Sequence, residues 1–365
     1  MRTLAIAVLT VVLLAGCAAS PQSPPLPTAT EGSDGLLGPV TPVGTPTALV
    51  GGLRAPWSVV RLESGSTLIS ERDRGVVREM TSDGQLRDMA AIDGVVAGGE
   101  GGLLGLAVLD NEWLYAYFTA ASDNRIERFA LEGEPGAYSL GASEEVLTGL
   151  AKAGNHNGGR IAFGPDGMLY ATVGDAGDPD LAQDTASLNG KILRMTPDGD
   201  VPDDNPGDSL VYSMGHRNPQ GIAWDDDGQL WAAEFGQNSW DELNRIEPGG
   251  NYGWPVVEGL GSNPDYIDPL AQWPTDQASP SGLAYTRGTF FLASLRGERL
   301  WVIHVHDGLV DPVDYFAGEY GRIRDVTAGP DGSLWFVTNN TDGRGSPAPE
   351  DDRLWQLRLD VFREG

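Results

Sequence analysis

The chain has 365 residues and carries 24 lysines and arginines against 52 aspartates and glutamates, a formal net charge of −28. A surface this acidic repels phosphate groups at long range, which argues against nucleic acid or an anionic lipid surface as a partner. The single cysteine is Cys17, so a folded domain that follows it has no internal disulfide, no thiol nucleophile and no CxxC metal site.

The first residues have the features of an export signal. Arg2 gives a positive start, residues 4–14 form an apolar run, and a Leu-Ala-Gly-Cys sequence ends at Cys17. Residues 1–17 are therefore predicted to be a lipoprotein signal peptide with a lipobox. The alternative is an ordinary cleaved signal with a chance cysteine. Acylation of Cys17 predicts an exported protein, at the cell surface or in the periplasm, whose only attachment to the membrane is this lipid anchor.

The next segment, residues 18–46, is rich in proline, serine, threonine and glycine and shows no apolar periodicity. This composition predicts a disordered tether between the membrane and the folded domain. Residues 47–365 are predicted to form that domain.

A recurring pattern runs through residues 53–360. Each copy has an apolar strand, a turn that usually contains Asp-Gly, a second apolar strand, and a third strand that mixes charged and apolar residues. Copies are separated by roughly 44 to 61 residues, which is typical of propeller blades with variable insertions. The copies start near Trp57, Leu104, Arg160, Gly221, Gly282 and Val326.

Six copies predict an all-β fold, a six-bladed β-propeller of four-stranded antiparallel blades around a central channel. The segment that starts at Thr47 is a candidate for a strand that closes the last blade. A long solenoid or a two-domain α/β enzyme fits this pattern poorly.

The first candidate site is the segment Asn155–Arg160, with the sequence NHNGGR. His156 precedes a Gly-Gly turn that leads into a predicted inner strand, a place that in propellers faces the mouth of the channel. An imidazole is the natural general base near neutral pH. The alternative is a histidine with a surface or structural role.

A group of arginines also precedes or begins predicted inner strands. Arg217 lies in the GHRNPQG loop, Arg296 precedes a glycine in blade five, and Arg322 and Arg324 alternate on one strand, which puts them on the same face. If these four arginines converge at the channel mouth they form an arginine socket for a planar polyanion, because guanidinium groups match carboxylates bidentately. Alternatively, each pairs with a neighbouring carboxylate.

The segment Glu234–Asn244 and the NYGWP sequence that ends at Pro255 combine carboxylates, amides and loop carbonyls. Such oxygen ligands suit a hard cation, and Ca²⁺ accepts six to eight of them. The alternative is an acidic loop without an ion. Two other acidic runs, residues 175–180 and 203–208, are predicted to be solvated turns.

Taken together, in this order and register, these segments resemble the soluble PQQ-dependent aldose sugar dehydrogenases of the glucose/sorbosone dehydrogenase family. The matching phrases span residues 52–358. The resemblance implies PQQ- and calcium-dependent oxidation of aldose sugars to lactones, with a small-molecule sugar as substrate and an unknown electron acceptor. It also implies that His156 is the general base while a hydride passes to the quinone, with Arg217 as its catalytic companion.

The resemblance assigns further residues to the cofactors. Main-chain carbonyls of two loop residues hold the cofactor calcium, and the neighbouring carboxylates with a tyrosine carbonyl hold a second, structural calcium. The implied PQQ contacts are Glu100, Arg217, Asn218, Arg296, Arg322 and Arg324. The implied calcium ligands are Gly236, Gln237, Asp241, Glu242 and Tyr252.

The chain departs from the best-known glucose dehydrogenases of this family at three positions. Asn155 stands where they have Asp, which affects the orientation and basicity of His156. Glu100 stands where they have Gln, and a carboxylate there repels an anionic cofactor unless it is protonated or paired. Arg296 replaces a lysine, which keeps the charge and changes the geometry.

Two other functions remain open at this point. A calcium-dependent propeller lactonase would need a metal deep in the channel, surrounded by carboxylates and amides, and no arginine socket. A non-catalytic propeller that binds glycans or proteins would keep the blades and use the histidine only for structure.

The lipobox generates a first prediction. Changing Cys17 to Ser should release the protein or leave its signal uncleaved, because two or more acyl chains, at about 0.8 kcal/mol per buried methylene, supply the membrane affinity. Partitioning of wild type and Cys17→Ser into detergent measures this. Equal partitioning of the two proteins would contradict the anchor.

Overall fold

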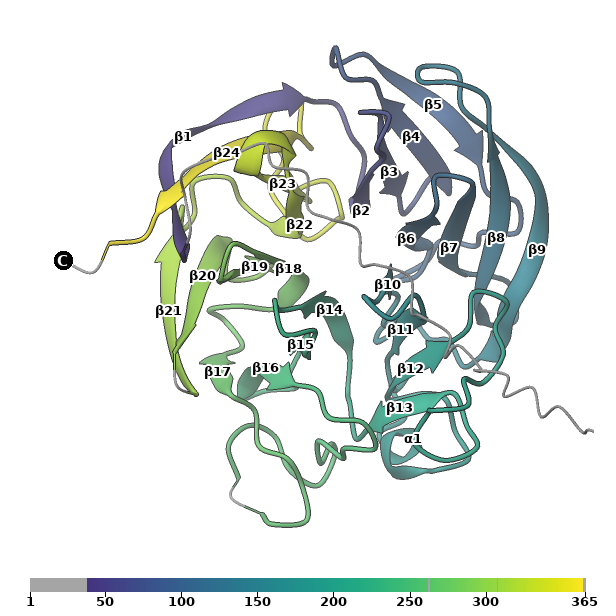
Figure 1. The fold of residues 1–365 in the computed structure, drawn as a ribbon, viewed down its shortest axis with the longest axis vertical. Helices are drawn as coiled ribbons and strands as arrows, with labels where there is room; N and C mark the ends of the chain where they lie inside the picture. The colour runs from purple at the N-terminus through teal and green to yellow at the C-terminus, as the bar shows by residue number, and fades with distance from the viewer. Residues whose placement is uncertain (1–37, 262, 307, 364–365) are drawn as a thin grey trace, which may run out of the picture. The chain divides into compact units, whose positions relative to one another are not determined.

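The computed structural model describes residues 38–261, 263–306 and 308–363, and nearly all of its regular elements are β-strands. These strands form six antiparallel sheets of four strands, arranged as blades around a centre (Figure 1). The predicted six-bladed β-propeller is therefore confirmed. In the described ranges the helices are α1 (Asp180–Gln183) and a 3₁₀ turn, η1 (Pro330–Gly332). No helix in this part of the chain is long and apolar enough to span a bilayer.

Each blade is numbered in chain order and its strands are given from the centre outward. Blades one to three consist of β2 (Pro56–Arg61), β3 (Thr67–Glu71), β4 (Val76–Met80) and β5 (Leu86–Ala91); β6 (Leu103–Leu109), β7 (Trp113–Thr119), β8 (Asn124–Glu132) and β9 (Ser139–Leu150); and β10 (Ile161–Phe163), β11 (Leu169–Val173), β12 (Lys191–Met195) and β13 (Val211–Met214). Blades four to six consist of β14 (Pro219–Trp224), β15 (Leu230–Glu234), β16 (Trp240–Arg245) and β17 (Ala271–Pro274); β18 (Pro280–Thr286), β19 (Thr289–Ser294), β20 (Arg299–His306) and β21 (Leu309–Tyr315); and β22 (Ile323–Ala328), β23 (Leu334–Thr338), β24 (Leu354–Val361) and β1 (Val40–Val50).

The ring is closed by β1, which pairs with β24 and supplies the outer strand of blade six. The closing strand begins at Val40 and not at Thr47, so the predicted tether boundary at residue 46 is wrong. Val40 is fully buried and its N–H donates to the Thr289 hydroxyl in blade five (2.8 Å). The prolines in this segment are tolerated because an outer strand pairs on one side only and its register shifts between Val43 and Thr47. The rest of the tether and the signal peptide lie outside the described residues.

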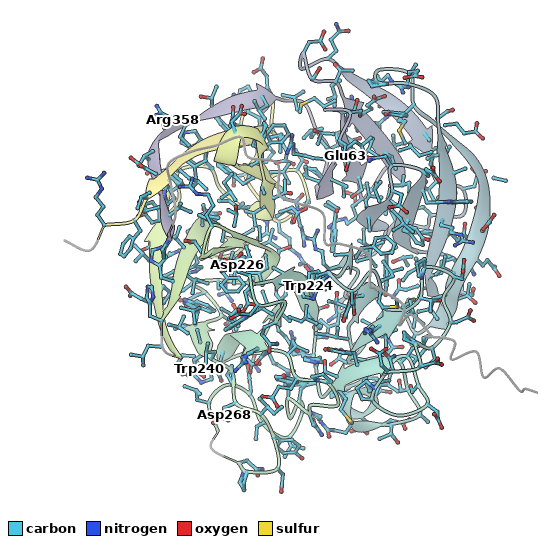
Figure 2. All side chains as sticks on the ribbon, viewed as in Figure 1. Glu63, Trp224, Asp226, Trp240, Asp268 and Arg358 are labelled. Carbon is cyan, nitrogen blue, oxygen red and sulfur yellow. The ribbon has the colours of Figure 1, made fainter. Side chains whose placement is uncertain are left out.

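The core is divided among the interfaces between blades. Buried apolar side chains of the described residues form six clusters, and each cluster joins two neighbouring blades. Tyr117 of β7 and Val173 of β11, for example, belong to the cluster between blades two and three. Side chains fill the spaces between the ribbons in Figure 2. Because both faces of each blade are covered, the middle strands are apolar on both faces and lack simple alternation.

The inner strands come close to one another because several of them carry glycine. A Cβ on Gly221 would lie 2.3 Å from the Ser281 carbonyl, and a Cβ on Gly282 would lie 2.2 Å from the Asp325 carboxylate. Only glycine fits at such distances. The channel is therefore narrow enough for side chains from opposite blades to meet.

One ion pair crosses this channel. Arg160, at the start of blade three, donates from Nη1 to Oδ2 of Asp325 in blade six (3.1 Å), and its Nη2 lies 3.1 Å from Oδ1. Asp325 also accepts the Val59 N–H of blade one (2.9 Å). Burial raises the pKa of Asp325, although Arg160 opposes the shift. The pair divides the loop-lined mouth of the channel from its other end.

A β-bulge at the start of β22 lets consecutive residues face this region. The register with β23 shifts between Ile323 and Asp325. Strict alternation would send Arg324 and Asp325 to opposite faces, whereas here Arg324 contacts Gln220 of blade four and Asp325 contacts Arg160. Bulges often re-aim side chains next to active sites.

The close approach of β18 to β22 generates a prediction. Gly282→Ala should lower the free energy of unfolding by about 1–3 kcal/mol, because its methyl group has to displace Asp325. Urea denaturation measures the change. Gly261→Ala is the control, since a Cβ at that residue would meet its nearest neighbour at an ordinary 3.5 Å. Equal destabilisation by the two substitutions would contradict the packing argument.

Candidate active site

A pocket of about 290 Å³ lies at the channel mouth, and several predicted cofactor residues line it. Loops and strand starts of blades one, two, four, five and six meet there. Glu100, Arg296, Arg322 and Arg324 therefore come together, although they lie up to 224 residues apart. The full lining is Trp57, Glu100, Gln220, Phe235, Ser279, Leu295, Arg296, Arg322, Arg324 and Arg344.

Arg324 is the most unusual cation of this pocket. It is 5% exposed, and its Nη1 donates to the Gln220 side-chain oxygen (2.7 Å) and the Ser281 hydroxyl (3.2 Å). It forms no ion pair with any described residue. Burial, with a further contribution from Arg72, lowers the pKa of Arg324 to about 9. A buried guanidinium with neutral partners only is a site that an anion would stabilise.

The other arginines differ in how their charge is balanced. Arg322 is also buried but pairs with Asp342, with Nη2–Oδ2 at 2.9 Å. Arg217 does not line the pocket. Its Nη1 donates to the backbone carbonyl of Phe235 (3.3 Å), a residue that does line the pocket. The Nε of Arg217 is buried without a partner, and burial lowers the pKa of this guanidinium. Three of the four predicted arginines, Arg217, Arg296 and Arg324, thus lack a carboxylate partner among the described residues, and of these Arg296 is exposed.

His156 is held by a carboxylate that the sequence reasoning missed. Its Nδ1 lies 2.7 Å from Asp175 Oδ1, and the Asp175 side chain is fully buried. The prediction that residues 175–180 form a solvated turn is therefore wrong at Asp175. Asn155, whose identity was expected to affect the orientation of the ring, is exposed and forms no hydrogen bond with it in the described structure. The local acidity of the chain hid the one buried acid of this run.

The backbone of His156 is also fixed. It has φ of 55°, in the left-handed region that is strained for a residue other than glycine. The His156 N–H donates to Glu100 Oε2 (3.1 Å), and the Gly158 N–H donates to the Asn218 side-chain oxygen (3.0 Å). Two predicted cofactor residues, Glu100 and Asn218, therefore hold the turn that carries the histidine.

A second histidine, His216, also has a carboxylate at Nδ1, but both of its ring nitrogens are hydrogen-bonded. His216 Nδ1 lies 2.8 Å from Glu234 in blade four, as His156 lies beside Asp175 in blade three. The other ring nitrogen of His216 is occupied by the Ser213 hydroxyl (2.8 Å), and His216 is fully buried. Nε2 of His156 has no hydrogen-bond partner among the described residues, and its side chain is 13% exposed. Of the two rings, His156 is the one that can exchange a proton with a substrate.

The carboxylate of Glu100 is paired and not free. Its Oε1 accepts from Arg344 Nη1 (2.8 Å), while Oε2 accepts the His156 N–H. Burial alone would raise the pKa of Glu100, but these bonds outweigh it and hold the pKa below its usual value. Arg344 thereby neutralises the charge that would otherwise repel an anion in the pocket.

The predicted calcium residues separate into two groups. Gly236, Glu242 and Tyr252 line a small pocket together with Glu234 and Glu258. Burial, followed by the charge of Glu234, raises the pKa of Glu242 to about 8, although Arg217 lines the same pocket.

Asp241 and Gln237 do not line that pocket. Both oxygens of Asp241 accept backbone N–H groups, from Gly236 and Ser279, and Asp241 is 1% exposed. The structure thus gives Asp241 the role of holding the loop. Described histidine, cysteine, aspartate and glutamate side chains form no ready group of three or more for a metal, so an ion here would need main-chain oxygens.

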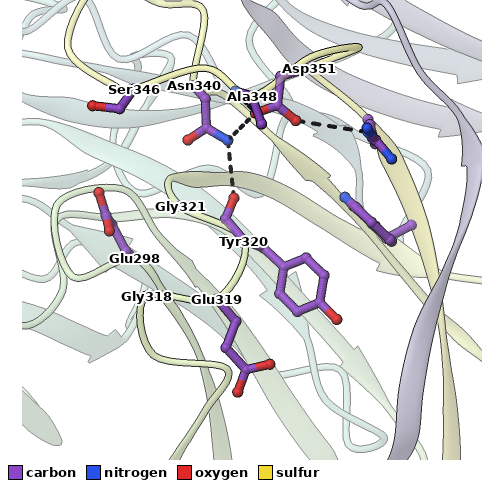
Figure 3. A pocket seen from close by; sticks show the side chains of 11 residues that line it. Glu298, Gly318, Glu319, Tyr320, Gly321, Asn340, Ser346, Ala348 and Asp351 are labelled. Atoms are coloured by element: carbon purple, nitrogen blue, oxygen red, sulfur yellow. Dashed lines mark hydrogen bonds and ion pairs between the residues drawn. The ribbon is translucent and has the colours of Figure 1, made fainter.

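A larger pocket, of about 430 Å³, lies between loops of blades five and six (Figure 3). None of the predicted site residues lines it. The Asn340 amide donates to the Tyr320 carbonyl (3.0 Å) and to Asp351 (3.1 Å), and the Asn340 oxygen accepts the Arg322 N–H (2.9 Å). Asn340 therefore fixes the backbone of Arg322, which lines the pocket at the channel mouth.

Comparison with known proteins identifies the family of the chain. The family described as Glucose / Sorbosone dehydrogenase matches residues 53–346. The chain belongs to this family. It is therefore a sugar dehydrogenase, an oxidoreductase that acts on a CH–OH group.

Three relatives are similar to the chain over between 60% and 90% of its length. The PQQ-bound form of the aldose sugar dehydrogenase from Streptomyces coelicolor is 48% identical, with a TM-score of 0.84 over 90% of this chain and 100% of that one. Aldose sugar dehydrogenase YliI of Escherichia coli is 27% identical over 79% of this chain and 88% of that protein. Quinoprotein glucose dehydrogenase B of Acinetobacter calcoaceticus is 32% identical over 60% of this chain and 54% of that protein.

The sequence reasoning missed several residues that the fold brings to the site. Arg344, Asp342 and Asp175 neutralise or orient residues that were predicted, and each lies on a loop. Glu258 accepts four consecutive backbone N–H groups of residues 237–240 and so shapes the candidate metal loop. One signal was available for Asp175: it follows the second strand of blade three closely, much as Glu234 ends the second strand of blade four.

Proposed function

We propose that the protein oxidises aldose sugars to lactones in a PQQ- and calcium-dependent reaction in which His156 is the general base. The observation that carries this proposal is Arg324, a buried guanidinium without a carboxylate partner in a chain of net charge −28. Acidic side chains are abundant, yet none of the described ones forms an ion pair with Arg324. Such a site fits an anionic ligand that arrives from solution, and a lactonase would have no use for it.

The residues present fit the three carboxylates of PQQ. Arg296, Arg322 and Arg324 line the pocket, and Arg217 and Asn218 lie beside it in the loop that leads into blade four. Forked guanidinium donors bind carboxylates in a fixed geometry. Bound PQQ would supply the acceptor for the hydride and the two electrons of the sugar. The PQQ-bound relative from Streptomyces coelicolor supports this assignment.

His156 is placed to remove the proton of the sugar hydroxyl. Nε2 is the open ring nitrogen, and Asp175 at Nδ1 stabilises the imidazolium that forms. As the hydroxyl proton passes to Nε2, the C1–H bond breaks with its electron pair, and the hemiacetal carbon becomes the carbonyl of a lactone. Glu100 and Asn218 keep the turn in place during this transfer.

Calcium fits the oxygen-rich pocket beside Arg217. Glu242 and Glu234 supply negative charge, and Gly236 and Tyr252 contribute backbone to the same walls. Ca²⁺ prefers such a mixture of carboxylate and carbonyl oxygens. A bound calcium ion would lower the energy of the buried carboxylates and polarise a nearby quinone oxygen as a Lewis acid.

Export and anchoring through Cys17 are part of the same proposal, since a sugar dehydrogenase at the cell surface meets its substrates directly. The test of the whole proposal is dye-linked oxidation of aldoses by purified protein with PQQ and Ca²⁺ added singly and together. Activity that requires both supports it. Lactone hydrolysis without sugar oxidation would favour the hydrolase instead.

The arginines generate a prediction with two opposite signs. Arg324→Met should raise the melting temperature of the protein without PQQ, because it removes an uncompensated buried charge. The same variant should bind PQQ about 10- to 100-fold more weakly, the loss expected for one charge-assisted contact. Thermal unfolding and a PQQ titration measure the two effects.

Arg322→Met is the matched control. It should lower the melting temperature, because it leaves the buried Asp342 without its cation. Destabilisation by Arg324→Met of the same size as by Arg322→Met would show that Arg324 is compensated after all.

The base generates a further prediction. His156→Ala should lower turnover by about 10²–10⁴-fold while PQQ still binds, because the sugar hydroxyl then has no positioned acceptor for its proton. Stopped-flow reduction of the loaded protein by sugar measures the step. His306→Ala is the control, since His306 is an exposed residue at the end of β20. Near-normal turnover in folded, PQQ-loaded His156→Ala would refute the assignment.

A further inference from the structure

Trp254 touches both the base and a cation of the candidate site, although the proposed reaction assigns it no role. Its indole Nε1 donates to Asp175 Oδ2 (2.9 Å), and the Arg217 guanidinium lies 5.5 Å from the centre of its ring. The main chain of Trp254 is itself fixed: its N–H donates to the Gly215 carbonyl (3.0 Å) and its carbonyl accepts from Gln183 (2.7 Å). The indole therefore has a defined position over the site.

The donors around Asp175 show what the indole does. Oδ1 of Asp175 is shared by His156 Nδ1 (2.7 Å) and the Gly177 N–H (2.7 Å). Oδ2 accepts from Trp254, which is its hydrogen-bond partner among the described residues. The carboxylate is fully buried, and these three donors are its hydrogen-bond partners among the described residues, so they set its plane. Without the indole, Oδ2 would have no such partner among the described residues.

We propose that Trp254 is a positioning residue for the base, whose indole N–H anchors the Asp175 carboxylate that orients His156. The inference rests on the proposed role of His156 as general base. It adds a residue from the β16–β17 connection, 79 positions away in sequence from Asp175, to the machinery of proton transfer.

The His216–Glu234 pair in blade four can be compared with the His156–Asp175 pair in blade three. There, Glu234 gives one oxygen to His216 and the other to the Arg217 backbone N–H. A backbone donor from the adjacent residue completes that carboxylate. In blade three the equivalent oxygen is completed by a side chain from a separate loop, so its donor can be removed by one substitution without touching the blade.

The indole also affects how strongly His156 holds a proton. A hydrogen bond to a carboxylate draws off negative charge, so losing the Trp254 donor leaves Asp175 more negative toward the imidazolium. The other charged groups near the ring stay in place. They are Glu100 at the His156 backbone, Arg344 paired with Glu100, and Arg217 against the Trp254 ring. The sign is thus fixed: removing the donor favours the protonated, inactive ring.

The test is Trp254→Phe, which keeps an aromatic ring under Arg217 and removes only the N–H. The titration midpoint of the His156 ring should rise by about half a unit to one unit. Selective ¹⁵N-histidine labelling and NMR measure it directly, since the chain has only four histidines and His156→Ala assigns the signal. The acid limb of the turnover profile should move to higher pH by the same amount.

The control is Trp231→Phe. Trp231 Nε1 donates to Asp225 with the same 2.9 Å distance, in a turn of blade four that contains no candidate site residue. This variant should leave the His156 midpoint and the acid limb unchanged. An unchanged midpoint in Trp254→Phe, or a loss of turnover that is uniform over pH, would overturn the inference, because a merely structural indole lowers activity at every pH.

The wild-type protein provides an independent measurement if Trp254→Phe does not fold. One of the ten indole N–H resonances should shift with pH at the same midpoint as His156, and this shift should vanish in His156→Ala. Absence of any co-titrating indole would also overturn the inference. Failure of the proposed function is distinguishable, since it would appear as normal turnover in His156→Ala whatever the indole does.

Discussion

The ion pair between Arg160 and Asp325 ties the site to the fold. It spans the channel from blade three to blade six, and Asp325 also accepts a backbone N–H of blade one. Arg160 follows the His156 turn by four residues, and Asp325 follows Arg324 directly. One contact therefore fixes the spacing between the base and the buried cation. The stacking of Arg160 and Arg324 on the same ring, Trp57, with guanidinium-to-centroid distances of 4.4 and 5.5 Å, strengthens this link.

The site keeps its positive charge in an acidic protein by controlling which carboxylates reach which arginines. Asp342 neutralises Arg322 and Asp325 neutralises Arg160, whereas Arg217 and Arg324 face amides, hydroxyls and carbonyls. Burying such unpaired cations lowers stability, and the six apolar clusters between the blades supply the stability that offsets it. Arg217 and Arg324 thus mark where an anionic ligand would supply the missing negative charge. Glu100 follows the same logic in reverse, since Arg344 cancels its charge beside the pocket.

The repeat in the sequence predicted the blades well because three strands of each blade share one pattern of apolar residues and Asp-Gly turns. The outer strands, such as β5 and β9, are half-exposed and have no common pattern, so only the structure locates them. The early start of β1 was hidden for a similar reason, since a strand that pairs on one edge tolerates the prolines that elsewhere indicate a loop. Within the site, glycine-containing motifs identified His156 and the arginines as candidates. Their partners Asp175 and Arg344 were missed, because they come from loops 19 and 244 residues away from the groups that they bind, in a chain where single acids and arginines carry little information. Only the position of Asp175 just after a second strand pointed to it.

Blades three and four show how the same repeat yields one structural and one reactive histidine. Both blades place an imidazole before the inner strand and a carboxylate at or just after the end of the second strand, and both form the Nδ1 contact. In blade four, Ser213 occupies Nε2 and Tyr252 stacks on the ring at 4.8 Å, so the group is fully bonded and cannot act. In blade three no described side chain bonds to Nε2, and the donor that completes the carboxylate is the indole of Trp254. The difference between a structural histidine and a base is thus the partner at one nitrogen. A repeat fold can therefore convert a structural histidine into a base by removing the group that bonds to Nε2. The carboxylate contact at Nδ1, which both roles need, stays the same.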